Sequence, residues 1–122
     1  VLGGESVNAT RLASCQYYSP ETGNWHSIRP MHFVRTVAAA AALDGYIYVA
    51  GGYDYSGMSV MERYDPATDT WIVLSSMKHK RYCSNMLTSC GKLFAIGGYE
   101  TIGAKTLTSI EMYDPESDSW EE

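Results

Sequence analysis

The chain has 122 residues, a length that fits one domain and leaves no room for a second sizeable hydrophobic core. Hydrophobic residues make up 45% and charged residues 19% of the sequence, which excludes a disordered tail. The formal net charge of −5 argues against non-specific binding to nucleic acid or to a membrane surface, although a local basic patch could still matter.

The longest apolar stretch, residues 37–43, is too short to span a bilayer and lacks the flanks of a signal peptide. The three cysteines, Cys15, Cys83 and Cys90, are odd in number and form no C-x-x-C pair. We therefore expect them to be small buried apolar residues in a reducing compartment, because a disulfide framework needs paired cysteines. This favours the cytoplasm, with the nucleus as the alternative.

One pattern occurs three times along the chain. Glycine pairs are spaced by 48 and 46 residues, a proline follows each of three tyrosines by two residues, and a tryptophan follows each of these tyrosines by seven. The recurring residues are Gly3, Gly4, Tyr18 and Trp25; Gly51, Gly52, Tyr64 and Trp71; and Gly97, Gly98, Tyr113 and Trp120. Matching internal spacing of this kind indicates an internal structural repeat.

Four short strands fit within the second copy. Helix propensity alone favours a helix over the alanine run 38–42. The aligned segment 83–89 has no such run, so the repeat favours a strand in both copies. The expected strands are a over residues 37–43, b over 46–50 after the Asp44-Gly45 hairpin turn, c over 59–64, and d from 71 to 74. An antiparallel unit of four strands and about 45–50 residues is typical of a propeller blade.

The combination of Gly-Gly, Tyr-Asp-Pro and Trp resembles the kelch repeat, and the resemblance covers essentially the whole chain. The second copy matches most fully, whereas in the first copy Ser19 replaces the Asp and Gln16 replaces a Glu. The resemblance implies an all-β fold built from the four-stranded antiparallel blades of a kelch β-propeller. Within that fold, the repeated glycines, tyrosines and tryptophans belong to the scaffold.

A propeller closes its ring with about four to eight blades, which protects the sheet edges. We therefore expect an incomplete ring of roughly ten strands here. Residues 1–28 correspond to strands b, c and d of a first blade, residues 29–75 to a complete second blade, and residues 76–122 to a third blade lacking most of strand d. Self-association of the chain through its open edges is a hypothesis that follows.

The d–a and b–c connections of a four-stranded blade lie on the same face, which we call the loop face. The loop face comprises residues 5–11, 29–35, 53–58, 77–82 and 99–107. In kelch substrate adaptors these loops recognise partner peptides, often through an arginine that opens strand a and a serine near the start of strand c. The matching residues here are Arg35, Arg81, Ser14 and Ser109, while Val60 stands at the serine position of the second copy.

The planar fork of arginine can hold a carboxylate or a phosphate bidentately. We therefore hypothesise that Arg35 and Arg81 recognise an acidic or phosphorylated segment of a protein or peptide ligand. The supporting residues would be His32, His79, Lys80, Tyr53, Tyr55 and Tyr99. In the alternative interpretation, both arginines are repeat residues that hold neighbouring loops, and the basic run is a solvated loop.

Resemblance to the BTB–kelch family implies a substrate-binding propeller that engages a cullin-type ubiquitin ligase through N-terminal domains outside this sequence. A cytoskeletal, actin-binding kelch scaffold is the alternative. An enzyme fragment similar to galactose oxidase is less favoured, because His26, His32 and His79 have no local metal-ligand spacing and no nucleophile is paired with a base. We expect no catalysis, no cofactor and no metal.

Overall fold

The structure, a computed structural model, describes residues 1–103 and 106–122. Its secondary structure in these residues consists of eleven β-strands. They are β1 Leu2–Glu5, β2 Arg11–Ser19, β3 Asn24–Ile28, β4 Ala39–Leu43, β5 Tyr46–Ala50, β6 Met61–Asp65, β7 Thr70–Leu74, β8 Asn85–Ser89, β9 Lys92–Ile96, β10 Ile110–Asp114 and β11 Ser119–Glu121. The described residues include no helix long and apolar enough to cross a membrane.

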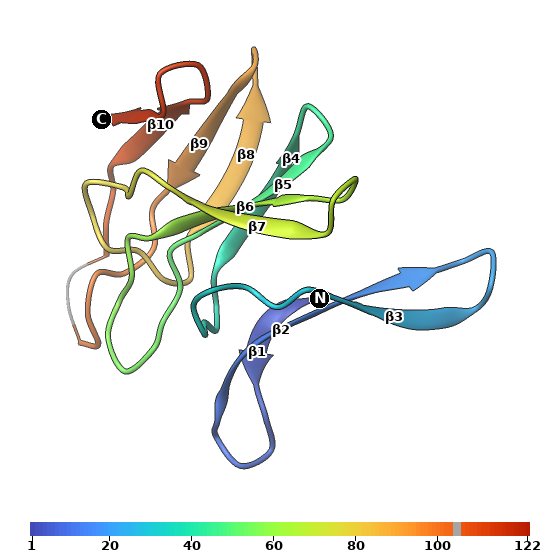
Figure 1. The fold of residues 1–122 in the computed structure, drawn as a ribbon. Helices are drawn as coiled ribbons and strands as arrows, with labels where there is room; N and C mark the ends of the chain where they lie inside the picture. The colour runs from blue at the N-terminus through green and yellow to red at the C-terminus, as the bar shows by residue number, and fades with distance from the viewer. Residues whose placement is uncertain (104–105) are drawn as a thin grey trace.

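The strands form three antiparallel sheets that follow one another along the chain (Figure 1). The first blade contains β1 to β3, the second β4 to β7, and the third β8 to β11, with sequential strands paired in each. The prediction of an all-β fold made of antiparallel blades is therefore confirmed. The short strand β11 brings the number of strands to eleven among the described residues, one more than the sequence suggested.

The alanine run does form a strand. β4 pairs with β5 from Ala39 opposite Ala50 to Leu43 opposite Tyr46, so the repeat predicts this segment better than helix propensity does. The strand begins two residues later than expected, because Val37 has a positive φ of 47°. Cys83, at the aligned position of the third blade, has a φ of 52°. Both inner strands therefore begin after a left-handed residue.

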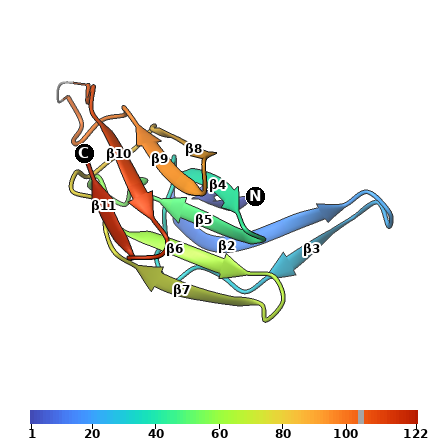
Figure 2. The same cartoon turned by 90° about the horizontal axis from the view of Figure 1, so that it is seen from above.

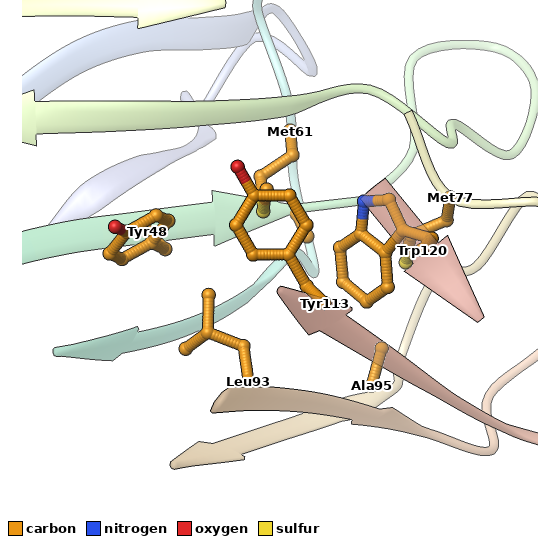
Figure 3. Packing of buried hydrophobic residues seen from close by; sticks show 8 residues of the cluster. Tyr48, Met61, Met77, Leu93, Ala95, Tyr113 and Trp120 are labelled. Carbon is orange, nitrogen blue, oxygen red and sulfur yellow. The ribbon is translucent and has the colours of Figure 1, made fainter. Parts of the chain in front are cut away.

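Blades pack through the repeated tyrosine and tryptophan. The rings of Tyr113 and Trp120 lie 5.2 Å apart between centroids and are buried against Tyr48, Met61 and Met77, which come from the second blade and the loop that follows it (Figure 3). Tyr64 and Trp71 pack in the same way in a cluster that includes Cys15 and Met31, from the first blade and its following loop. Each such pair thus covers the preceding blade, which stabilises the stack by removing apolar surface from water. Figure 2 shows the succession of blades from above.

Polar contacts fix the same junctions. The indole N–H of Trp71 donates to the carbonyl oxygen of Arg29 at 2.7 Å, and that of Trp120 donates to Ser75 at 2.9 Å. Asp69 accepts hydrogen bonds from the Arg29 backbone N–H and the Tyr64 hydroxyl, both at 2.9 Å. The second and third blades therefore each hold the chain where it leaves the outer strand of the preceding blade.

These contacts shift the pKa values of the groups involved. Burial, with the Asp69 carboxylate beside the hydroxyl, raises the pKa of Tyr64 to about 12. The Arg29 backbone N–H and then the Tyr64 hydroxyl lower the pKa of Asp69. Asp118 has the same role in the third blade, where hydrogen bonds from Ser75 and Tyr113 lower its pKa although burial opposes them. Charged carboxylates are therefore part of both junctions.

The cysteine prediction is right for one residue and wrong for two. Cys15 is buried, and burial raises the pKa of its thiol. Cys83 and Cys90 are exposed, because each occupies a left-handed position in a connection instead of a place in a strand. Cys90 stands in the turn between β8 and β9, where the second blade has Asp44.

Candidate functional site

Arg35 is entirely buried behind the loop face. Its relative accessible surface is 0%, and its guanidinium donates to Glu62 Oε2 at 2.7 Å and to the carbonyl oxygens of Gly51 and Val60 at 2.8 and 3.0 Å. Burial lowers the pKa of Arg35, against which the Glu62 carboxylate acts. The three acceptors lie at the end of β5 and the start of β6, so Arg35 ties its loop to the middle of the second blade.

Arg81 repeats this arrangement in the third blade. It is 0% exposed, contacts Glu111 at 3.0 Å, and donates to the carbonyl oxygens of Gly97 and Ser109 at 2.9 and 3.1 Å. Ser109, another predicted partner-binding residue, also accepts a hydrogen bond from Arg81 through its hydroxyl at 2.7 Å. This serine therefore already has a partner inside the chain.

The two buried glutamates also hold the backbone of the d–a loops. Glu62 accepts from the His32 backbone N–H at 2.7 Å and contacts the His32 ring at 2.9 Å. Glu111 accepts from the backbone N–H groups of Lys78 and His79 at 2.6 and 3.1 Å. The structure thus shows both arginines in the second role considered for them, as residues that hold loops, and their contact with a partner stays a prediction.

Other predicted site residues lie at the surface. His32, Lys80 and Ser14 are exposed, and His79 is partly exposed with its ring 3.0 Å from the Glu122 carboxylate. Residues 104–105 of the predicted loop face lie outside the described residues.

Three tyrosine rings pack in a row across the second and third blades, edge-to-face between Tyr53 and Tyr82 and tilted between Tyr82 and Tyr99. The ring centroids of Tyr53 and Tyr82 are 5.3 Å apart, and those of Tyr82 and Tyr99 are 5.7 Å apart. Tyr53 exchanges two backbone hydrogen bonds with Thr36, and Tyr99 exchanges two with Tyr82, so each b–c loop is tied to a d–a loop. Burial, and then the neighbouring Cys83, Tyr53 and Tyr99, raise the pKa of Tyr82.

Arg11 extends this row to the first blade. Its guanidinium carbon lies 4.1 Å from the centroid of the Tyr55 ring and 5.1 Å from that of Tyr53, distances typical of cation–π contacts. We call Tyr53, Tyr55, Tyr82 and Tyr99 the tyrosine ladder. Tyr55 is 78% exposed and Tyr99 is 40% exposed, so the ladder presents aromatic surface at the loop face.

Sequence reasoning identified three of the four ladder residues and missed Tyr82 and Arg11 as site residues. Tyr82 had a usable signal, since it directly follows the arginine that opens strand a. Arg11 had none, because its contact with Tyr55 bridges two blades and no local spacing encodes it.

The described residues contain no group of three or more His, Cys, Asp or Glu side chains placed to hold a metal ion. An open cavity of about 360 Å³ lies between the first two blades and is lined by Tyr17, Ile28, Ile47, Tyr64 and Pro66. These side chains are mainly apolar, and the only titratable groups among them are two phenols.

Comparison with known proteins gives matches in sequence and in structure. A family model described as the Kelch motif matches residues 35–78 and 80–122. Human Kelch-like protein 23 is 37% identical over 68 residues, which cover 53% of this chain and 11% of the relative. An F-box/kelch-repeat protein of Arabidopsis thaliana is 38% identical over 52 residues, covering 43% of this chain and 14% of that protein.

Zebrafish (Danio rerio) Kelch-like protein 26 is 35% identical over 57 residues, covering 44% of this chain and 9% of the relative. The chain thus spans between 9% and 14% of the length of these curated relatives. The solved structure of YjhT superposes with a TM-score of 0.69 at 17% identity, covering 80% of this chain and 40% of that one. This last similarity shows the fold alone.

Proposed function

Since the chain belongs to the kelch-repeat family, a family of protein-interaction modules, we propose that its loop face binds a segment of a partner protein through the tyrosine ladder. The ladder is the observation that carries the proposal, because together with Arg11 it joins residues of all three blades and leaves aromatic surface exposed. Tyrosine provides a large contact area at a low cost in side-chain entropy, and aromatic residues are enriched in protein interfaces.

Substitution of the ladder tests this proposal. Tyr55→Ala and Tyr99→Ala together remove the two most exposed rings of the ladder and leave the buried Arg–Glu pairs in place. We expect loss of most partner binding by the protein at its full natural length. The matched control is Glu116→Ala, an exposed residue in the c–d turn at the opposite end of the blade. Equal binding by the ladder variant and wild type would contradict the proposal.

For the cellular role, we propose substrate recognition for a cullin-type ubiquitin ligase. Support comes from the resemblance to BTB–kelch proteins and the similarity to Kelch-like proteins 23 and 26. Co-purification of a cullin with the full-length protein tests the role. Absence of cullin together with co-sedimentation with filamentous actin would favour the cytoskeletal alternative.

We further propose that the protein binds its partner without catalysing a reaction. We propose the cytoplasm or the nucleus as its location. No paired nucleophile and base stands out in the sequence. Metal analysis of the purified protein tests this view, and stoichiometric copper would contradict it. Fluorescence imaging of the tagged full-length protein tests the location, for which a secreted protein would be the contrary result.

A further inference from the structure

The contact of the Arg11 guanidinium with two tyrosine rings leaves its N–H groups without hydrogen-bond acceptors in the described residues. The guanidinium lies over the rings of Tyr55 and Tyr53, and within the described residues Arg11 neither donates a side-chain hydrogen bond nor forms an ion pair. Its Nε is buried with no acceptor in that same part of the chain. The rings therefore fix the plane of the guanidinium while its outer N–H groups keep their capacity to donate.

The loop face carries three other arginines, and each differs from Arg11 in this respect. Arg29 donates from its Nε to the carbonyl oxygen of Asp69 at 2.9 Å. Arg35 is neutralised by Glu62 at 2.7 Å, and Arg81 by Glu111 at 3.0 Å, and all four side chains are fully buried. Glu5 stands opposite Arg11 in the β1–β2 pairing, yet the two side chains form no ion pair. Among Arg11, Arg35 and Arg81, Arg11 is thus the one held in place with no counter-charge from the described residues.

On the basis of the proposed function, we propose that Arg11 selects a glutamate or aspartate side chain in the bound segment of the partner. The carboxylate would accept two N–H groups from the guanidinium edge, and apolar residues next to it would lie on Tyr53, Tyr82 and Tyr99. Since the stacked guanidinium is already ordered, little conformational entropy is lost when the carboxylate binds. The residue proposed to bind an acidic side chain of the partner is therefore Arg11, in place of Arg35 and Arg81.

The surroundings favour a carboxylate over a phosphate. Phosphorylated motifs are recognised by clusters of arginines, and the buried glutamates neutralise Arg35 and Arg81 here. The loops that flank the ladder also carry Glu5, Asp54 and Glu100, which would repel a doubly charged group more strongly than a single carboxylate.

Binding to libraries of short random peptides tests this inference with the full-length protein. One library has a central glutamate, a second has glutamine at that position, and a third has phosphoserine. We expect the wild-type protein to prefer the glutamate library over the glutamine library by about 5-fold to 10-fold, as for a charged hydrogen bond that is partly shielded from water. The phosphoserine library should bind no more tightly than the glutamate library.

Variants assign the preference to Arg11. Arg11→Met should abolish the preference while binding to the glutamine library remains, and Arg11→Lys should retain part of it and serves as the folded, charged control. Glu5→Gln should not reduce it. Equal wild-type binding to the glutamate and glutamine libraries, a preference that persists in Arg11→Met, or tighter binding of phosphoserine would each overturn the inference and leave the proposed function standing. Absence of binding to every library would contradict both.

Discussion

Arginines that look alike in the sequence have different physical roles in the structure. Arg35 and Arg81 lie at matched positions of the repeat, and each forms a buried ion pair with a glutamate. Arg11 begins β2, directly after a loop whose length varies between copies, and its contacts depend on how two blades meet. Repetition therefore marks the residues that build the blade, whereas Arg11, the partly exposed charge that we propose contacts a partner, stands outside the repeat.

The buried pairs should be important for stability. Arg35→Met leaves the Glu62 carboxylate buried without its charge partner, which should lower the free energy of unfolding by about 3–5 kcal/mol. The double variant Arg35→Met, Glu62→Leu should recover part of this loss, since it removes the unpaired charge. Arg11→Met, at a partly exposed position, loses its cation–π contacts with Tyr53 and Tyr55 and should cost only about 0.5–1 kcal/mol. Urea unfolding measures all three, and equal losses for Arg35→Met and Arg11→Met would contradict the assignment.

Acid should weaken the junctions between blades. The pKa values of Asp69 and Asp118 are lowered from the ordinary value of 3.8, so the charged carboxylates favour the folded state. This contribution is complete above pH 3.8 and is lost as the pH falls through the lowered pKa values. Asp118→Asn should therefore unfold at lower urea concentration at neutral pH and show a smaller decrease on acidification than the wild type. Parallel pH profiles for the two proteins would show that the carboxylate charge has no such role.

At the scale of strands, the repeat proved a better guide than residue propensity. Residues 39–43 are alanine-rich yet form β4, because the strand pairs along its whole length with β5 and packs at a blade junction. Val37 and Cys83 have positive φ values, so both inner strands begin two residues later than expected. The sequence could not predict this, because valine and cysteine rarely adopt such angles.

Close approach of the chain at the end of β5 explains one of the repeated glycines. A Cβ on Gly51 would lie 2.2 Å from the carbonyl oxygen of Arg81, whereas one on Gly45 would meet nothing within 4 Å, although both residues have positive φ. Gly45→Ala should cost about 1 kcal/mol from backbone strain alone. Gly51→Ala should cost several times as much, because the loop that carries Arg81 must move. Thermal unfolding of both variants measures the difference, and equal shifts would argue against this contact.

The tryptophans allow a matched test of the blade junction. Trp71→Phe removes the hydrogen bond to Arg29 and should lower the free energy of unfolding by about 1–2 kcal/mol. Trp25, at the same position of the first blade, is 57% exposed, so Trp25→Phe should change stability by less than about 0.5 kcal/mol. Urea unfolding compares the two, and a larger effect at Trp25 would mean that the first blade is covered in solution.

For the whole molecule, the sequence predicts the blades well and the site only in part. Constant spacing of glycine, tyrosine and tryptophan follows from contacts that recur in each blade, so the fold could be inferred without coordinates. The row formed by Arg11 and the tyrosine ladder depends on the positions of three blades relative to one another, and this information is not contained in any single repeat. Burial of Arg35 and Arg81 likewise became visible only with the glutamates on neighbouring strands in place.

Uncovered aromatic surface on the first blade favours self-association of the isolated chain. Tyr18 and Trp25 are about half exposed, although their counterparts in the second and third blades are buried against a neighbouring blade. We expect the mass measured by light scattering to rise with the concentration of this chain, because burial of this surface is favourable. Trp25→Glu should suppress the increase, whereas a monomeric mass at all concentrations would contradict this expectation.

Quantitative affinity purification of the full-length protein tests the central claim, that the loop face is the binding surface, most directly. The proteins retained by wild type are compared with those retained by the Tyr55→Ala, Tyr99→Ala double variant and by the Glu116→Ala control. We predict that a specific set of partners is lost with the ladder variant and kept with the control. Retention of these partners by the ladder variant, or their loss with Glu116→Ala, would place the binding surface elsewhere on the molecule.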